Sequence, residues 1–272
     1  MRALALIILL TLTACSGADL LNATIPREGY SLHRDIAYGN DPRQQLDIYE
    51  PDGATNAPVI LFIYGGSWQA GRREDYRFVG EAFASKGFVT VIADYRLYPQ
   101  VRYPAFVADT AAALRYTHAH IAAFGGDPAD IFLAGHSAGA YNAMMVAEQH
   151  PAPWLRGIIG IAGPYDFTPT DPNIVAIFST AVPDGYLPIR HARPGLAPAL
   201  LATGDADDTV EPRNTHALAA KLREQGGEVR EITYPDIGHI GIVLSLARGF
   251  RDKTTLREDI SRFIDAHRAK SE

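Results

Sequence analysis

The residues best suited to chemistry in this chain form the pentapeptide Gly-His-Ser-Ala-Gly at positions 135–139. A short apolar run, residues 130–134, precedes it, and a run rich in helix formers, residues 140–148, follows it. A serine held between glycines at a sharp strand-to-helix turn is the setting in which a hydroxyl becomes a nucleophile. Larger flanking side chains would collide with the neighbouring strand and helix. Ser137 is therefore our candidate nucleophile.

A serine hydroxyl needs a base to take its proton, and that base needs an acid to orient it. Two later loops offer both, in the chain order serine, acid, histidine. The first follows an apolar run at 198–202 and contains Asp205, Asp207 and Asp208, any of which could be the acid. The second follows a strand-like run at 231–234 and contains His239 after a glycine that lets the loop approach the serine. His239 is our candidate base.

The other histidines do not suggest a second chemistry. His136 neighbours Ser137 in the sequence, and we expect its side chain to point elsewhere. His118 and His120 are two residues apart on an expected helix, so they face different directions and make a poor metal pair. We predict no metal and no organic cofactor.

Two loops carry a family resemblance. The acid loop, Gly-Asp-Ala-Asp-Asp-Thr-Val at 204–210, resembles that of α/β-hydrolase esterases, where the catalytic aspartate lies three residues before a valine. This implies Asp207, with Asp208 as the alternative. The loop Tyr-Gly-Gly-Ser-Trp at 64–68 resembles the His-Gly-Gly-Gly-Trp loop of hormone-sensitive-lipase-like esterases, with tyrosine in place of the histidine and serine in place of the third glycine.

The resemblance implies an oxyanion hole, a set of N–H donors that stabilise the negative oxygen of the reaction intermediate. Two donors would be the backbone N–H groups of Gly66 and Ser67. The third would be the N–H of Ala138, the residue after the nucleophile.

The remaining sequence predicts the elements that position these residues. Alternating stretches at 32–38 and 45–49 flank a turn and predict an antiparallel pair. Fully apolar runs are typical of parallel strands covered on both faces, and they occur at 58–64, 87–93, 131–134, 157–162 and 198–202. Helical segments alternate with them at 77–85, 109–123, 138–149, 213–225 and 256–269.

This alternation predicts an α/β protein with a mostly parallel, doubly wound sheet of about eight strands, the α/β-hydrolase fold of the resemblance. The stretch 168–193 interrupts the pattern with proline, aspartate and scattered aromatic residues. We expect it to form a small cap insertion above the sheet.

The N-terminus is expected to lie outside the fold. A cationic start and an apolar run at 3–12 are followed by Leu-Thr-Ala-Cys at 12–15, which resembles the lipobox of bacterial lipoproteins. The resemblance implies a signal peptide at 1–14 and lipid on Cys15. The small, polar residues that follow predict a tether at 15–30, and the hydrolase domain is expected at 31–272. The chain would then be exported and anchored in the bacterial cell envelope. A plain secretory signal with a coincidental cysteine is the alternative.

Composition limits the partners. The 272 residues are 47% hydrophobic, and the net charge of −6 argues against nucleic acid, which needs a basic face. Cys15 is the only cysteine, so no intramolecular disulfide can form. The sequence does not indicate an oligomeric state.

We expect a serine hydrolase of carboxylic esters, acting on a small-molecule, short-chain substrate because the expected cap is small. Membrane contact is expected through the lipid anchor only. Two alternatives remain: an arylformamidase-type amide hydrolase, which the loop Gly-Gly-Ser-Trp also resembles, and a non-catalytic hydrolase-like binding lipoprotein.

Overall fold

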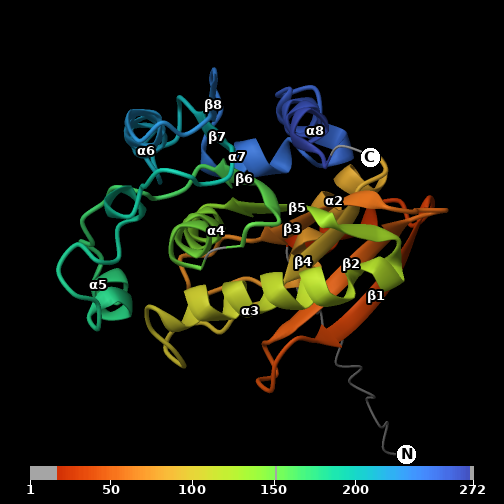
Figure 1. Cartoon of the computed structure of the whole chain (residues 1–272), viewed down its shortest axis with the longest axis horizontal. Coiled ribbons are helices and arrows are strands. Elements are labelled where there is room, and N and C mark those ends of the chain that lie inside the picture. Colours follow the sequence, from red (N-terminus) through yellow and green to blue (C-terminus); the bar gives the residue numbers. More distant parts are fainter. Residues whose placement is uncertain (1–16, 151, 270–272) are drawn as a thin grey trace, which may run out of the picture.

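The computed structural model describes residues 17–150 and 152–269. The predicted signal peptide at 1–14 and the predicted lipid site at Cys15 therefore lie outside the described residues. A twisted sheet crosses the molecule, with α3 (Ala105–His120) and α4 (Ala138–Gln149) on one side and α2 (Arg77–Ala84) and α8 (Leu256–His267) on the other (Figure 1).

The sheet has eight strands, which in chain order are β1 (Tyr30–Ala37), β2 (Gln45–Pro51), β3 (Ala57–Ile63), β4 (Val89–Ala93), β5 (Gly126–His136), β6 (Leu155–Ile161), β7 (Ala199–Gly204) and β8 (Val229–Tyr234). Their spatial order is β1-β2-β4-β3-β5-β6-β7-β8. The pairs β1–β2 and β2–β4 are antiparallel, and all other pairs are parallel. This confirms the predicted opening antiparallel pair and the doubly wound, mostly parallel sheet.

The apolar runs form the centre of the sheet, as their composition predicts. Every residue of β3, β4 and β7 is buried, because helices cover both faces there. Edge strand β8 is only partly buried. The remaining helical elements are α1 (Gly17–Ala23), α5 (Pro172–Phe178), α6 (Arg213–Glu224), α7 (His239–Leu244) and four short 3₁₀ turns, η1 (Arg73–Tyr76), η2 (Ile121–Phe124), η3 (Pro188–Arg190) and η4 (Arg248–Phe250).

Parallel strands end at the same edge of a sheet, and this gathers the candidate residues. The loop at 64–68 follows β3, and Ser137 follows β5. The acid loop follows β7, and His239 follows β8. The segment expected to form a cap connects β6 to β7 and contains α5 and η3; α5 lies beyond α4, away from the sheet (Figure 1). Asp171 caps α5 by accepting hydrogen bonds from the N–H groups of Asn173 and Ile174.

The segment predicted as a polar tether is not free where the structure describes it. Residues 17–23 form α1, and the Asn22 side chain donates a 2.7 Å hydrogen bond to the carbonyl of Glu74. Leu21 packs against the core and Ile25 is buried. These two apolar side chains pack the segment onto the domain. The mostly small and polar composition of the segment gave no indication of this contact. Within the described ranges no helix is long and apolar enough to cross a membrane.

Candidate active site

Ser137 occupies a strained turn between β5 and α4. Its backbone has φ 56° and ψ −125°, a conformation that residues other than glycine rarely adopt. A Cβ on Gly135 would collide with the backbone of Gly139, and a Cβ on Gly139 would collide with the carbonyl of Ile63. The two glycines therefore let α4 pack close to β3. They hold the serine at the carboxyl end of β5, as the sequence predicts.

A continuous chain of hydrogen bonds joins the three residues predicted to form the triad. The Ser137 Oγ lies 2.9 Å from the Nε2 of His239, and the Nδ1 of His239 lies 2.8 Å from the Oδ2 of Asp207. All three side chains are buried. Because an ionised carboxylate only accepts, His239 carries its proton on Nδ1 and presents the lone pair of Nε2 to the serine hydroxyl. This is the arrangement a general base requires.

Asp207 is held in its ionised form. Burial alone would raise the pKa of its carboxyl, but the hydrogen bond from His239, the N–H groups of Val210 (2.8 Å) and Thr209 (3.0 Å) and the charge of His239 together lower that pKa below its usual value. A permanent carboxylate at this point fixes the histidine tautomer and stabilises the imidazolium that forms when Ser137 loses its proton.

The other two acids of the loop take different places. Asp208 is exposed, and its carboxylate accepts from the hydroxyl of Thr209 at 3.4 Å. Asp205 is also exposed and accepts from the N–H of Asp236 at 2.7 Å. Within the described residues neither has a hydrogen bond to His239, so the geometry favours Asp207 over the alternative Asp208.

The loop at 64–68 lies directly against the serine. A Cβ on Gly65 would stand 2.8 Å from the Cβ of Ser137, and Gly66 and Ser67 both have positive φ, 125° and 52°. Among the described residues no hydrogen bond occupies the N–H of Gly66, Ser67 or Ala138. These donors are thus free to bind an oxyanion, the role the family resemblance implies for them.

Tyr64, which stands where the resembling esterases have histidine, is held by a polar network. Its hydroxyl donates to the Oδ1 of Asp94 (2.6 Å) and accepts from the guanidinium of Arg43 (2.7 Å). That guanidinium also donates to the carbonyls of Gly71 (2.9 Å) and Tyr95 (2.9 Å). The Tyr95 hydroxyl donates to the carbonyl of Tyr64 at 3.1 Å. Burial and the charge of Asp94 raise the pKa of the Tyr64 hydroxyl, so it remains a donor.

A second arginine completes this network. The backbone N–H of Arg73 donates to the Oδ1 of Asp94 at 2.8 Å, and its guanidinium donates to Asp94 (2.5 Å), Asp47 (2.8 Å) and Asp35. Arg73, Asp47 and Asp94 are buried. Each buried charge therefore has partners, as its desolvation requires. The network joins segments far apart in the chain behind the loop at 64–68.

His136 contributes to the site in a way that the sequence does not reveal. Its Nε2 lies 3.0 Å from the carbonyl oxygen of His239, and the two rings have centroids 4.8 Å apart. Burial and the charge of His239 lower the pKa of His136 to about 3, so it is neutral and donates through Nε2. Its hydrogen bond goes to the backbone of His239 and not to Ser137, in line with the expectation that the side chain points away from the serine, but its role in fixing the backbone of the candidate base was not predicted.

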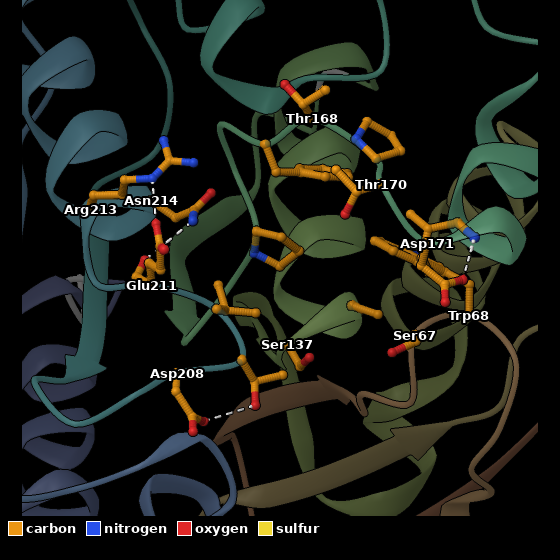
Figure 2. Close-up of a pocket in the computed structure, with 17 residues that line it drawn as sticks. Ser67, Trp68, Ser137, Thr168, Thr170, Asp171, Asp208, Glu211, Arg213 and Asn214 are labelled. Carbon is orange, nitrogen blue, oxygen red and sulfur yellow. Dashed lines mark hydrogen bonds and ion pairs between the residues drawn. The ribbon is translucent and has the colours of Figure 1, made fainter.

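Ser137 opens into a pocket of about 470 Å³. Ser67, Trp68 and Ala138 also line it. Figure 2 shows Asp208 of the acid loop, Glu211, and Arg213 and Asn214 of α6 on one side and Trp68 and Asp171 on the other. Trp68 is fixed by a hydrogen bond to Asn142 (3.0 Å) and packs edge-on against Phe178, with ring centroids 4.9 Å apart. Aromatic side chains thus fill the space behind Trp68, on the side of Trp68 that faces away from the pocket.

With this geometry established, comparison with known proteins gives the class of fold. The structure superposes on a truncated carbohydrate esterase from gut microbiota with a TM-score of 0.77, at 19% identity over 89% of this chain and 98% of that one. A thermophilic esterase from Thermogutta terrifontis with butyrate bound gives a TM-score of 0.71, at 24% identity over 90% of this chain and 97% of that one. The chain has the α/β-hydrolase fold.

Sequence comparisons point the same way. Residues 46–171 match the family model described as BD-FAE. A probable isoprenylcysteine alpha-carbonyl methylesterase of Oryza sativa subsp. japonica is 27% identical over 269 residues, covering 86% of this chain and 64% of that protein. Esterase LipC of Mycobacterium tuberculosis is 28% identical over 241 residues, covering 77% and 60%. The chain thus spans less than two thirds of the length of these curated relatives.

Proposed function

We propose that this protein hydrolyses carboxylic esters through an acyl-enzyme formed on Ser137. The observation that carries the proposal is the buried hydrogen-bond chain from Ser137 through His239 to Asp207, which ends in an open pocket. The named esterases among the similar proteins support it.

The mechanism follows from the positions of the donors and acceptors. His239 takes the Ser137 proton on Nε2 while the hydroxyl oxygen attacks the ester carbonyl, and Asp207 stabilises the resulting imidazolium. The N–H groups of Gly66, Ser67 and Ala138 bind the oxyanion of the tetrahedral intermediate. His239 then donates its proton to the leaving alcohol. In the second half-reaction the same residue deprotonates water, which releases the acid and restores Ser137.

The substrate is proposed to be a small, neutral, short-chain ester. The pocket beside Ser137 has a volume of about 470 Å³ and is bounded by Trp68, which packs against Phe178, and this limited space supports a short acyl chain. Among the described residues that line the pocket there are three carboxylates, those of Asp171, Asp208 and Glu211, and one arginine, Arg213, which pairs with Glu211 at 2.6 Å. This charge balance disfavours anionic substrates.

The proposal also includes the predicted location. The lipobox-like sequence supports cleavage before Cys15, lipid on that residue and attachment of the domain to a membrane of the cell envelope. The enzyme would then act on small esters that reach the membrane surface.

The decisive experiment compares Ser137→Ala with Ser67→Ala, the other serine that lines the pocket. Ser137→Ala should lower kcat for p-nitrophenyl acetate on the order of a thousandfold or more and abolish labelling by a fluorophosphonate probe. Ser67→Ala should keep both. Turnover by Ser137→Ala close to that of the unaltered chain would refute the proposal. Faster hydrolysis of N-formylkynurenine than of any ester in a panel of acyl lengths would instead indicate the arylformamidase alternative.

A further inference from the structure

A second pocket borders the same loop at 64–68: Gly65 and Gly66 line it, whereas Ser67 and Trp68 line the pocket at Ser137. It has a volume of about 620 Å³ and shares no lining residue with the first. Its apolar lining comes from five elements and includes Leu21 of α1, Tyr76 of η1, Phe78 of α2, Val243 of α7 and Phe250 of η4. The mechanism proposed above uses the N–H of Gly66 in this lining but gives the apolar side chains of the pocket no role.

Large apolar side chains are exposed around this pocket. Ile240 and Phe250 line it with exposed fractions of 58% and 41%, and Leu20, next to the lining residue Leu21, is 63% exposed. We call Leu20, Leu21, Ile240 and Phe250 the apolar face. Exposed apolar side chains concentrated around a pocket indicate a surface that another apolar phase covers.

Positive charge lies beside the apolar face. Residues 248–253 contain Arg248, Arg251 and Lys253 against one acid, Asp252, in a chain whose net charge is −6. Both arginines also pair with Glu81; the Arg248 side chain is 57% exposed and the Arg251 side chain 19%, and Lys253 is exposed. Apolar side chains next to arginine and lysine are the pattern that binds a bilayer with anionic headgroups.

The first described residues of the chain also lie at this pocket. Gly17, the first described residue, lines the pocket. Cys15 is two residues earlier, so a lipid on its sulfur would start within about 7 Å of chain from the pocket lining. A lipid attached at Cys15 would therefore bring this part of the surface to the membrane.

We propose that the apolar face lies against an anionic lipid bilayer, with hydrocarbon chains entering the 620 Å³ pocket. The inference goes beyond ester hydrolysis, and it relies on the proposed N-terminal anchor only to bring the protein to the membrane. Insertion of Ile240 and Phe250 gives the domain one fixed orientation on the bilayer, which a flexible tether would not.

The test measures which exposed positions touch lipid in the full-length, membrane-anchored protein. Single substitutions Phe250→Cys and Ile240→Cys place a thiol-reactive fluorophore on the apolar face. Val175→Cys and Val182→Cys are the matched controls, because both are exposed apolar residues of the segment expected to form the cap. Each protein is reconstituted into vesicles of phosphatidylethanolamine and phosphatidylglycerol with or without a lipid that carries a nitroxide quencher on its acyl chain. The unaltered chain, treated with the same fluorophore, gives the background from Cys15.

The labels at 250 and 240 should lose about half of their fluorescence or more on quencher vesicles, whereas the labels at 175 and 182 should lose about a tenth or less. Flotation of each sample reports attachment independently, and p-nitrophenyl acetate turnover reports folding and catalysis. If the chain floats with the vesicles but all four labels are quenched equally, or only those at 175 and 182 are, the proposed orientation is wrong although the anchor stands. A chain that does not float overturns the proposal entirely. Neither result bears on the proposed catalysis, which the turnover assay measures separately.

Discussion

The two sides of the site around Ser137 are held by different kinds of contact. On the nucleophile side, the position of the serine follows from steric contacts of Gly135 and Gly139 with neighbouring backbone. On the oxyanion side, the loop at 64–68 follows the core strand β3, and the Tyr64 hydroxyl accepts a hydrogen bond from Arg43 and donates one to Asp94, two residues of separate segments.

This difference has a consequence for how each side tolerates change. A steric turn is determined by adjacent residues, so a substitution there disturbs the nucleophile directly. A polar network distributes its support over several partners, so the loss of one hydrogen bond leaves the others in place. We therefore expect the largest effects from the triad, intermediate effects from the loop backbone and smaller effects from the network that supports the loop.

The largest effect within the comparison is expected at the acid. Asp207→Asn removes the carboxylate that fixes the tautomer of His239, and kcat should fall on the order of a thousandfold. Asp208→Asn, the matched control one residue away, alters an exposed side chain and should change kcat by less than about threefold. Steady-state kinetics on p-nitrophenyl acetate measures both. The reverse ranking would make Asp208 the acid.

The loop backbone should come next. Gly66→Pro removes one proposed donor and imposes a φ near −65° where the loop has 125°, so kcat should fall on the order of a hundredfold. Ser67→Ala keeps its N–H and should retain activity within about tenfold. Circular dichroism should show both variants folded. A loss in Ser67→Ala as large as that in Ser137→Ala would mean that the hydroxyl itself takes part in catalysis.

A smaller effect is expected from the network behind the loop. Tyr64→Phe keeps the ring stacked between Tyr76 and Tyr95, but it removes the hydroxyl that joins Asp94 to Arg43. The oxyanion donors act mainly in the transition state, so kcat should fall by about tenfold while KM changes little.

Tyr234→Phe is the matched control for this substitution. Its hydroxyl is also a buried donor to a carboxylate, that of Asp259 at 2.9 Å, but it lies outside the site. It should lower the melting temperature as Tyr64→Phe does and leave kcat unchanged. Equal kcat losses in the two variants would mean that the Tyr64 hydroxyl contributes only to the stability of the fold and not to the position of the oxyanion loop.

The same difference explains what the sequence could predict. The doubly wound sheet, the turn at Ser137 and the order of serine, acid and histidine all depend on residues that are neighbours in the chain, and local patterns reveal such residues. The choice of Asp207 within the acid loop needed a family motif, because three carboxylates stand within four positions.

The polar support of the site could not be predicted in this way. Tyr64 and Asp94 are 30 residues apart, and His136 and His239 are 103 residues apart. No spacing rule relates such partners before the sheet order is known. The packing of α1 was missed for a related reason, since its contact with Glu74 spans 52 residues.

The last and smallest expected effect is a change in stability at the C-terminal end of α4, the helix that follows Ser137. In the described part of the chain, a buried carboxyl group there lacks the hydrogen-bond partners that the buried carboxylates behind the loop at 64–68 have. Glu148 on α4 is buried, and within the described residues neither carboxyl oxygen has a hydrogen-bond partner. Arg193 donates instead to the backbone carbonyl of Glu148 at 3.1 Å. Burial raises the pKa of Glu148 from 4.5 to about 9, so the folded protein keeps this carboxyl protonated at neutral pH.

The sign of the pH dependence follows from this shift. Between pH 4.5 and about 9 the folded state holds a proton that the unfolded state releases, so this residue makes the free energy of unfolding fall as pH rises. Glu148→Gln has nearly the same shape and cannot ionise, so it should raise the free energy of unfolding by about 1–3 kcal/mol at pH 7 and by almost nothing at pH 4.5. Urea unfolding at the two pH values measures the difference, with the exposed Glu224→Gln as the control and kcat expected to stay unchanged. A gain that is the same at both pH values would show that Glu148 is ionised in the folded protein, and the nucleophile helix would then need a charged partner of the kind that supports the oxyanion loop.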